Sequence, residues 1–300
     1  MKNKNRGTAV AVQEQVRQSD PDETLRNLKR MVVNKMTKFL SSKWKNYRFR
    51  FVPWVAINLH HKMKDNARIV PSAAADPLIS ASKVLSQLSN VIPFLVRPKK
   101  PEDSSETYSE KSRKIMFLKL GFSIERGPSP IPGGGTGVFV NRGKVRKGQV
   151  VALYPGTIYR SFEPILLASI NNPFIFRCLD GTHIDGKDWG LSRLVFKSCA
   201  GRDRMGPREV ADISWLTKNP INPLNVGQYV NNHTKDYPSN VAYQEVELSQ
   251  GLSHETRSMM PYVNYSGGRG LPNRIVALVA TRNIEQGEEI LSSYLTLVGR

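Results

Sequence analysis

The feature that most constrains this chain is a series of short apolar runs in its last two thirds, each rich in β-branched residues and bounded by Gly, Pro or Asn. Five runs have this character, namely Val138 to Val140, Gln149 to Tyr154, Phe174 to Phe176, Gln244 to Leu248 and Ile275 to Ala280. Runs of this length and composition predict strands. Because no long helical pattern alternates with them, a doubly wound nucleotide fold is not expected. We therefore expect a mainly β domain with short helices.

The first third of the chain has a different character, because it contains a long basic segment. No acidic residue occurs from Thr24 to Lys64. Apolar residues from Leu28 to Leu40 recur every three or four positions after the acidic residues at 20–23, which predicts an amphipathic helix. Its apolar face has two interpretations, packing on the protein's own core or binding to a partner or membrane.

A stretch from Arg97 to Glu106 separates the two parts. It combines Pro, Ser and charged residues without apolar content, which is typical of a solvated connection. Before it, the apolar spacing from Leu78 to Ile92 predicts a second short helix that ends at Pro93. We therefore expect a basic, mostly helical N-terminal region with a linker at 1–114 and a β-rich domain at 115–300.

Composition limits the partners and the compartment. The 44 basic and 25 acidic residues give a net charge of +19, which points to an anionic partner such as nucleic acid, a nucleosome or an acidic protein. A solvated Lys-rich surface is the alternative. The two cysteines, Cys178 and Cys199, are too few for a disulfide framework or a four-thiolate zinc site, and the dispersed histidines give no ligand set, so we assign no metal.

No apolar run is long enough to span a membrane, and no secretory signal follows the charged residues at 1–6. We therefore expect an intracellular protein that is not secreted. The nucleus or cytoplasm is the expected location, and a mitochondrial one is the alternative.

Four separated segments, taken in order, resemble the SET-domain methyltransferases. The first begins with the glycine motif at 135–139 and ends at Tyr154-Pro155-Gly156, and the second is a hairpin pattern from Phe176 to Gly186. The third runs from Gly227 to Thr234 and is followed by Asn240. The fourth, Val279 to Tyr294, is the most specific, because it matches the family's closing Ala-x-Arg-Asp-Ile-x-x-Gly-Glu-Glu-Leu-x-x-x-Tyr at many contiguous positions.

The resemblance implies a SET fold that transfers a methyl group from S-adenosylmethionine to a lysine of a protein substrate. The catalytic residues that it implies are Tyr294 and Tyr154, which would line a channel for the lysine. The cofactor-binding residues that it implies are Gly135, Thr136, Gly137, Val138, Asn231, Asn232 and Tyr294. Two registers of the third segment stay open, because the family's Asn matches either Asn231 or Asn232.

Three departures from the family pattern bear on these expectations. A Cys-rich zinc segment does not follow Tyr294, and Ser292 stands where the family often has Phe or Tyr. Residues 191–226 form a long insertion, either a substrate-facing wall or a solvated basic loop, with the basic residues Arg193, Lys197, Arg202, Arg204 and Arg208.

These departures leave two alternative functions. One is a catalytically inactive SET-fold interaction module whose basic arm binds an anionic partner. The other is a nucleic-acid-binding protein that acts through residues 24–64.

Overall fold

The computed structural model describes residues 47–49, 67–95, 105–204, 210–248, 253–267 and 274–299. All of them lie in one compact unit, Asn46–Arg300. Apart from the three residues of strand β1 (Tyr47–Phe49), the acid-free segment at 24–64 and its predicted helix lie outside the described residues. The predicted boundary near residue 114 stays a prediction.

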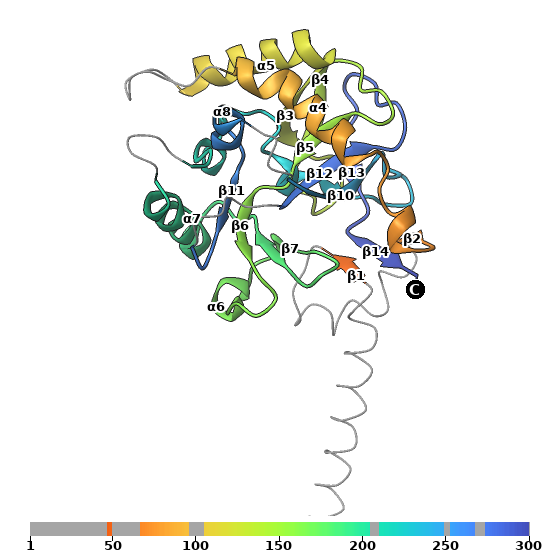
Figure 1. Cartoon of the computed structure of the whole chain (residues 1–300). Coiled ribbons are helices and arrows are strands. Elements are labelled where there is room, and N and C mark those ends of the chain that lie inside the picture. The colour runs from red at the N-terminus through yellow and green to blue at the C-terminus, as the bar shows by residue number, and fades with distance from the viewer. Residues whose placement is uncertain are drawn as a thin grey trace, which may run out of the picture. The chain divides into compact units, whose positions relative to one another are not determined.

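The larger sheet of the described part has the strand order β11-β6-β8-β7-β1-β14-β2 (Figure 1). Its other strands are β11 (Tyr262–Asn264), β6 (Gly156–Tyr159), β8 (His183–Asp185), β7 (Ile175–Arg177), β14 (Leu295–Val298) and β2 (Arg68–Val70). Strands β7 and β8 pair antiparallel with Phe176 opposite Ile184, which confirms the predicted hairpin. Strand β14 lies between β1 and β2, so the segment after Tyr294 is bound on both sides by residues from before position 71.

A second sheet contains most of the segments that resemble the family. Its strand order is β5-β12-β10-β13-β9, and its strands are β5 (Val150–Leu153), β12 (Arg274–Ala280), β10 (Val241–Glu247), β13 (Leu291–Ser292) and β9 (Asn231–Asn232). In β12 the six residues from Ile275 to Ala280 are all buried, as expected for a central strand with both faces covered. A separate hairpin pairs β3 (Phe122–Pro128) with β4 (Thr136–Gly143).

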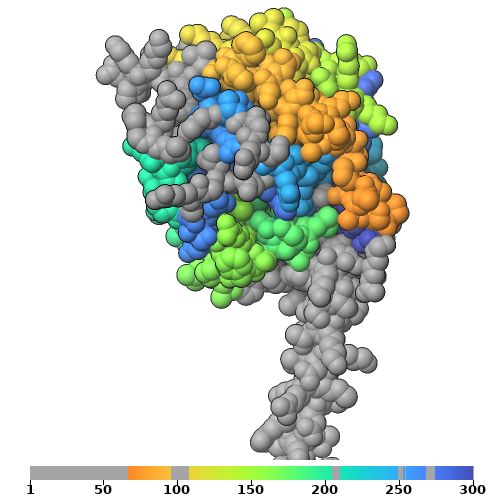
Figure 2. All heavy atoms as spheres, in the orientation of Figure 1, coloured from red at the N-terminus to blue at the C-terminus, as the bar shows by residue number. Residues whose placement is uncertain are grey.

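Two helices close the core over this sheet. The helices α4 (Ala81–Val91) and α5 (Ser105–Leu120) lie along one side of the molecule, above β3, β4 and β5 (Figures 1 and 2). Val84, Leu88 and Val91 of α4 are fully buried in the same apolar cluster as Met116 of α5. Helix α4 and the 3-10 turn Ile92–Phe94 that follows it confirm the helix predicted to end at Pro93.

The insertion at 191–226 contains structure that the sequence did not predict. Helix α7 (Gly190–Arg202) spans its first part, and Phe196 of this helix packs edge-on against Trp215 with ring centroids 5.0 Å apart. Both side chains are buried in a small apolar cluster of their own. The insertion is therefore folded around a core in its described residues, and the predicted mainly β fold with short helices is confirmed around it.

Candidate functional site

Three of the family-like segments meet where strands β9, β13 and β4 come together. Strands β9 and β13 pair in parallel, with Asn231 opposite Leu291 and Asn232 opposite Ser292. Just before β13, the N–H of Ile290 donates to the carbonyl of Val138 on β4 over 2.7 Å. The glycine motif, the asparagine motif and the closing motif, far apart in the sequence, are thus joined by backbone hydrogen bonds.

The side chain of Asn240 fixes the closing motif in this position. Its Nδ2 donates to the carbonyl of Glu289 over 2.8 Å, and its Oδ1 accepts the N–H of Leu291 over 2.8 Å. The backbone N–H of Asn240 also donates to the carbonyl of Leu291 over 2.9 Å. Asn240 is only 1% exposed, so water cannot replace these bonds, and the amide acts as a clamp on the chain just before Tyr294.

The carboxylate of Glu289 lies against the glycine motif. Its Oε2 accepts the hydroxyl of Ser129 over 2.8 Å, and its Oε1 accepts Nδ2 of Asn231 over 2.9 Å. A Cβ added to Gly137 would overlap Oε1 and lie 2.8 Å from Cδ of the same carboxylate. The backbone dihedrals of Gly137 are not in the left-handed region, so this position needs glycine for space and not for conformation.

The two neighbouring asparagines have different contacts. Nδ2 of Asn231 donates both to Glu289 and to the carbonyl of Thr136 over 3.3 Å. Oδ1 of Asn232 instead accepts the backbone N–H of Tyr294 over 2.9 Å. Asn231 therefore faces the glycine motif, and Asn232 holds the backbone of the predicted catalytic tyrosine.

Tyr294 is partly buried, and its hydroxyl donates to the carbonyl of Val230 over 3.2 Å. The hydroxyl proton is used in this bond, so toward any further partner the phenolic oxygen can act only as an acceptor. The side chain is thus held from both ends, through its backbone by Asn232 and through its hydroxyl by the residue before β9.

Tyr154 lies deeper in the fold than Tyr294. It is fully buried, and its hydroxyl donates to the carbonyl of Phe174 over 2.7 Å. The centroid of its ring lies 6.2 Å from that of Tyr243 in an edge-on arrangement. The hydroxyl oxygen of Tyr243 in turn accepts a hydrogen bond from the hydroxyl of Ser292 over 3.0 Å. The structure therefore connects Tyr154 to Ser292 of the closing motif through Tyr243, a side chain that the sequence did not single out.

The rest of the predicted cofactor site lies in and beside strand β4. Gly135 and Thr136 are exposed, whereas Gly137 and Val138 are buried. Gly135 has a φ of +59°, and its carbonyl accepts the N–H of Ser129, which closes the turn before β4. All the predicted cofactor-binding residues except Tyr294 thus lie on β4, its preceding turn or β9.

Four contributing residues were not assigned a role from the sequence. They are Ser129, Asn240, Tyr243 and Glu289. Glu289 and Asn240 lie within the quoted motifs, but their contacts depend on a strand pairing that the motif does not reveal.

Three residues before Asn231, the side-chain amide of Gln228 is 1% exposed and has no hydrogen-bond partner within the described part of the chain.

A cluster of possible metal ligands occurs elsewhere among the described residues. Cys178, Asp180 and Glu245 bring one ligand atom each to within 4.8 Å of one another. Arg274 makes ion pairs with both carboxylates, at 2.5 Å to Asp180 and 3.5 Å to Glu245. A guanidinium thus supplies the positive charge at this cluster.

Over the described ranges, no helix is both long enough and apolar enough to cross a membrane.

Two known proteins that are similar to this chain have the same name, SET domain-containing protein 9. Human SET domain-containing protein 9 is 40% identical over 296 residues, which covers 88% of this chain and 99% of the human protein. The Pongo abelii protein of the same name is 50% identical over 188 residues, 63% of this chain and 69% of that protein.

Solved structures give weaker likenesses. A chain of CpSET8 from Cryptosporidium aligns over 94% of its length with 87% of this chain, at 14% identity and a TM-score of 0.33. No protein-family model matches the chain.

Proposed function

This chain belongs to the SET domain-containing protein 9 family of SET-domain methyltransferases. From that premise we propose that it transfers a methyl group from S-adenosylmethionine to a lysine side chain of a protein substrate. The observation that carries the proposal is the joining of the glycine, asparagine and closing motifs at β4, β9 and β13.

The orientation of the Asn231 amide supports a cofactor site beside Gly137. Both partners of this amide, the carboxylate of Glu289 and the carbonyl of Thr136, are acceptors. Only the NH₂ end can face them, so Oδ1 must point away from both. A carbonyl oxygen held in this way suits the ammonium of an amino acid, which is the group at the methionine end of S-adenosylmethionine.

The same contacts favour one register of the asparagine motif. We assign the cofactor contact to Asn231 and a positioning role to Asn232, because the Oδ1 of Asn232 is already bonded to the N–H of Tyr294. The cofactor residues in this proposal are then the backbone of Gly135 to Val138 together with Asn231. Tyr294 would border this site from the end of β13.

The chemistry requires a neutral amine, although a free lysine has a pKa of about 10.4. When bound, S-adenosylmethionine supplies an electrophilic methyl group on a positively charged sulfur. Tyr294 would accept a hydrogen bond from the amine, because its own proton is donated to Val230, and would so orient the nitrogen lone pair. Burial of the amine among aromatic side chains would lower its pKa, since desolvation disfavours the ammonium.

Tyr154 would act as a fixed wall of the lysine channel. Its hydroxyl is bonded to Phe174 and its ring packs against Phe176 at 5.2 Å, so the side chain has little freedom to move. We propose that it sets the shape of the channel and excludes water. Neither tyrosine needs to act as a strong base in this mechanism.

A protein carrying the target lysine is the substrate in this proposal. The anionic partner expected from the charge of the chain would bind the basic region at 24–64, and the protein would act inside the cell. Both statements extend the expectations drawn from the sequence, and apart from strand β1 the basic region lies outside the described residues.

The test removes one oxygen atom from the proposed site. Tyr294→Phe should keep the fold and cofactor binding but lower methyl transfer by roughly 10–1000-fold, the range for loss of one positioned polar group at a reacting centre. Transfer is measured with cofactor labelled in the methyl group and a pool of candidate protein substrates. Tyr237→Phe is the control, because Tyr237 is 45% exposed in the loop after β9.

Equal activity of wild type and Tyr294→Phe would show that Tyr294 has been wrongly placed. If both proteins bind the cofactor and neither transfers methyl to any substrate tested, the inactive-module alternative gains support.

A further inference from the structure

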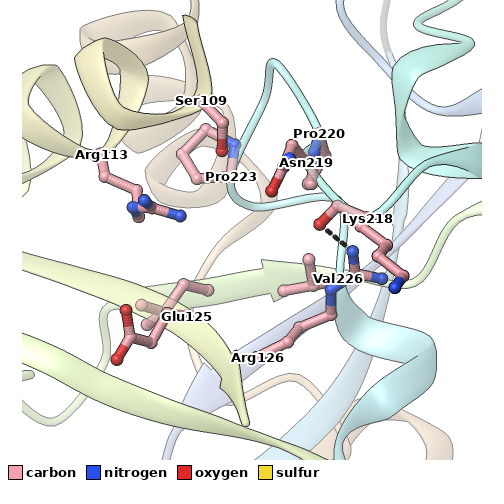
Figure 3. Close-up of a pocket in the computed structure, with 10 residues that line it drawn as sticks. Ser109, Arg113, Glu125, Arg126, Lys218, Asn219, Pro220, Pro223 and Val226 are labelled. Atoms are coloured by element: carbon pink, nitrogen blue, oxygen red, sulfur yellow. Dashed lines mark hydrogen bonds between the residues drawn. The ribbon is translucent and has the colours of Figure 1, made fainter. Parts of the chain in front are cut away.

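A small cavity lies between helix α5, strand β3 and the loop at 217–226, which is the last part of the insertion (Figure 3). Its volume is about 110 Å³, several times the ~10–15 Å³ that one ordered water needs and below the ~300 Å³ at which pockets hold whole small molecules. The cavity therefore suits one small chemical group. None of the predicted catalytic or cofactor-binding residues lines it.

Three cations from three separate elements surround this cavity. Arg113 reaches it from α5, Arg126 from β3 and Lys218 from the loop, and Glu125 is the single acid among the lining residues (Figure 3). No described carboxylate forms an ion pair within 4.0 Å of Arg113, Arg126 or Lys218. The lining thus has three cations and one acid, and Asp188 and Glu110, outside the lining, interact electrostatically with Arg126 and Arg113 without an ion-pair contact.

Arg126 is held in place and cannot simply turn into solvent. Its Nη2 donates to the carbonyl of Thr217 over 3.0 Å and to the carbonyl of Lys218. Its guanidinium carbon lies 4.8 Å from the ring centroid of Tyr229, and the hydroxyl of Tyr229 donates to Asp188 over 2.7 Å. These contacts place the Arg126 guanidinium at a defined point of the cavity wall, with Asp188 as the acid that interacts with it at longer range.

The remainder of the wall combines apolar side chains with Ser109 and Asn219. Ile124 and Val226 are 1% and 4% exposed, and Pro220 and Pro223 line the side formed by the loop. An apolar surround lowers the local dielectric constant and strengthens the attraction between a bound anion and the cations.

We propose that this cavity is a binding site for a single oxyanion, a carboxylate or phosphate group. The guanidinium groups of Arg113 and Arg126 present planar donors that match such oxyanions, and Lys218 adds a third charge beside Arg126 (Figure 3). The apolar surfaces of Ile124 and Val226 provide room for the carbon atoms that carry the group. The oxyanion is either free or part of an acidic or phosphorylated peptide side chain.

The test titrates inorganic phosphate into the full chain and follows binding by phosphorus NMR, with chloride at equal ionic strength as the reference. Arg113→Gln and Lys218→Gln should each weaken phosphate binding by about two- to fivefold, the effect of one partly exposed charge pair. Arg146→Gln and Lys83→Gln are matched controls, because both residues are exposed and neither lines the cavity. They should leave phosphate binding unchanged.

Glu125→Gln should change phosphate affinity in the opposite direction to the cation variants, which distinguishes binding in this cavity from a general attraction of phosphate to a basic protein. Removal of the single acid of the lining should tighten phosphate binding. Equal effects of the cavity and control variants, or no phosphate binding at tens of millimolar, would overturn the proposal.

Short peptides then identify the source of the oxyanion. Peptides with one glutamate or one phosphoserine are compared with a serine peptide and with free phosphate, with the same variants. Tighter binding of an acidic peptide assigns the site to a peptide side chain, and equal or weaker binding assigns it to free phosphate. The titrations need no methyl transfer and no cofactor, so their failure would leave the methyltransferase proposal untouched.

Discussion

A methyl group added at position 137 should displace the carboxylate of Glu289. In the structure a Cβ at Gly137 would overlap Oε1 of Glu289, whereas a Cβ at Gly127, the residue opposite Gly137 in the β3–β4 hairpin, would make only ordinary contact at 3.4 Å with the ring of Phe139. Gly127→Ala is therefore a matched control for Gly137→Ala. Both substitutions touch the same aromatic ring, and only one meets the carboxylate.

The magnitude follows from the bonds that the carboxylate makes. Movement of Glu289 breaks its hydrogen bonds to Ser129 and Asn231, and such bonds to a charged group are worth about 1.5–3 kcal/mol each. Water can replace part of this, because Glu289 is only partly buried. A Gly→Ala change at an unstrained position otherwise stabilises by about 0.4–1 kcal/mol. We therefore expect Gly137→Ala to destabilise by about 1–2 kcal/mol.

The assay is urea unfolding of Gly137→Ala, Glu289→Ala and the double variant. Without the carboxylate, Gly137→Ala should no longer destabilise, so the two changes should couple by about 1–3 kcal/mol, the range for residues in contact. Gly137→Ala should also weaken cofactor binding, because Asn231 loses one of its two partners. An identical cost of Gly137→Ala with and without Glu289 would refute the arrangement, and so would an equal cost of Gly127→Ala.

Three further predictions concern other parts of the chain. Asn240→Ala should lower the free energy of unfolding, measured in urea, by about 2–4 kcal/mol, because it leaves the buried N–H of Leu291 without its acceptor. The control Asn283→Ala removes a comparable but exposed hydrogen bond. It should lower the free energy of unfolding by under about 1 kcal/mol. Burial, with a nearby guanidinium, lowers the pKa of His183 from 6.5 to about 4. The unfolded chain therefore binds a proton that the folded chain does not, and stability should fall as the pH drops from 6.5 toward 4; His183→Gln should flatten this slope, and an unchanged slope would contradict the assignment. Deletion of residues 1–45, which stops before strand β1, should reduce salt-sensitive binding to DNA and leave cofactor affinity unchanged; loss of solubility would instead place the deleted segment in the core.

The strands could be predicted from the sequence because their apolar runs are short, β-branched and clearly bounded. Two helices could not be predicted with the same ease. In α5 the buried side chains include Ser109 and Ser112 beside Met116, so no continuous apolar stripe marks the helix. In α7 exposed Leu191 and Leu194 alternate with basic residues, and this obscures the buried face.

The candidate site shows the same division. Contiguous motifs identified Tyr294 and the asparagine pair as candidate site residues. The hydrogen bond from the N–H of Tyr294 to Asn232 could not be predicted in this way, because it joins residues 62 positions apart. It depends on pairing between two-residue strands, which carry almost no signal of their own. The carboxylate of Glu289 is similar, because its neighbour Gly137 becomes specific only once β4 lies beside the closing motif.

The measurement that tests the central claim most directly is calorimetric titration of S-adenosylmethionine into the purified full chain. We expect one binding site, and we expect Asn231→Ala to weaken it by about tenfold or more, the effect of losing a hydrogen bond to a charged group. Asn232→Ala should act mainly on methyl transfer, through the position of Tyr294. Absence of binding at millimolar cofactor, or equal affinity of wild type and Asn231→Ala, would contradict the claim.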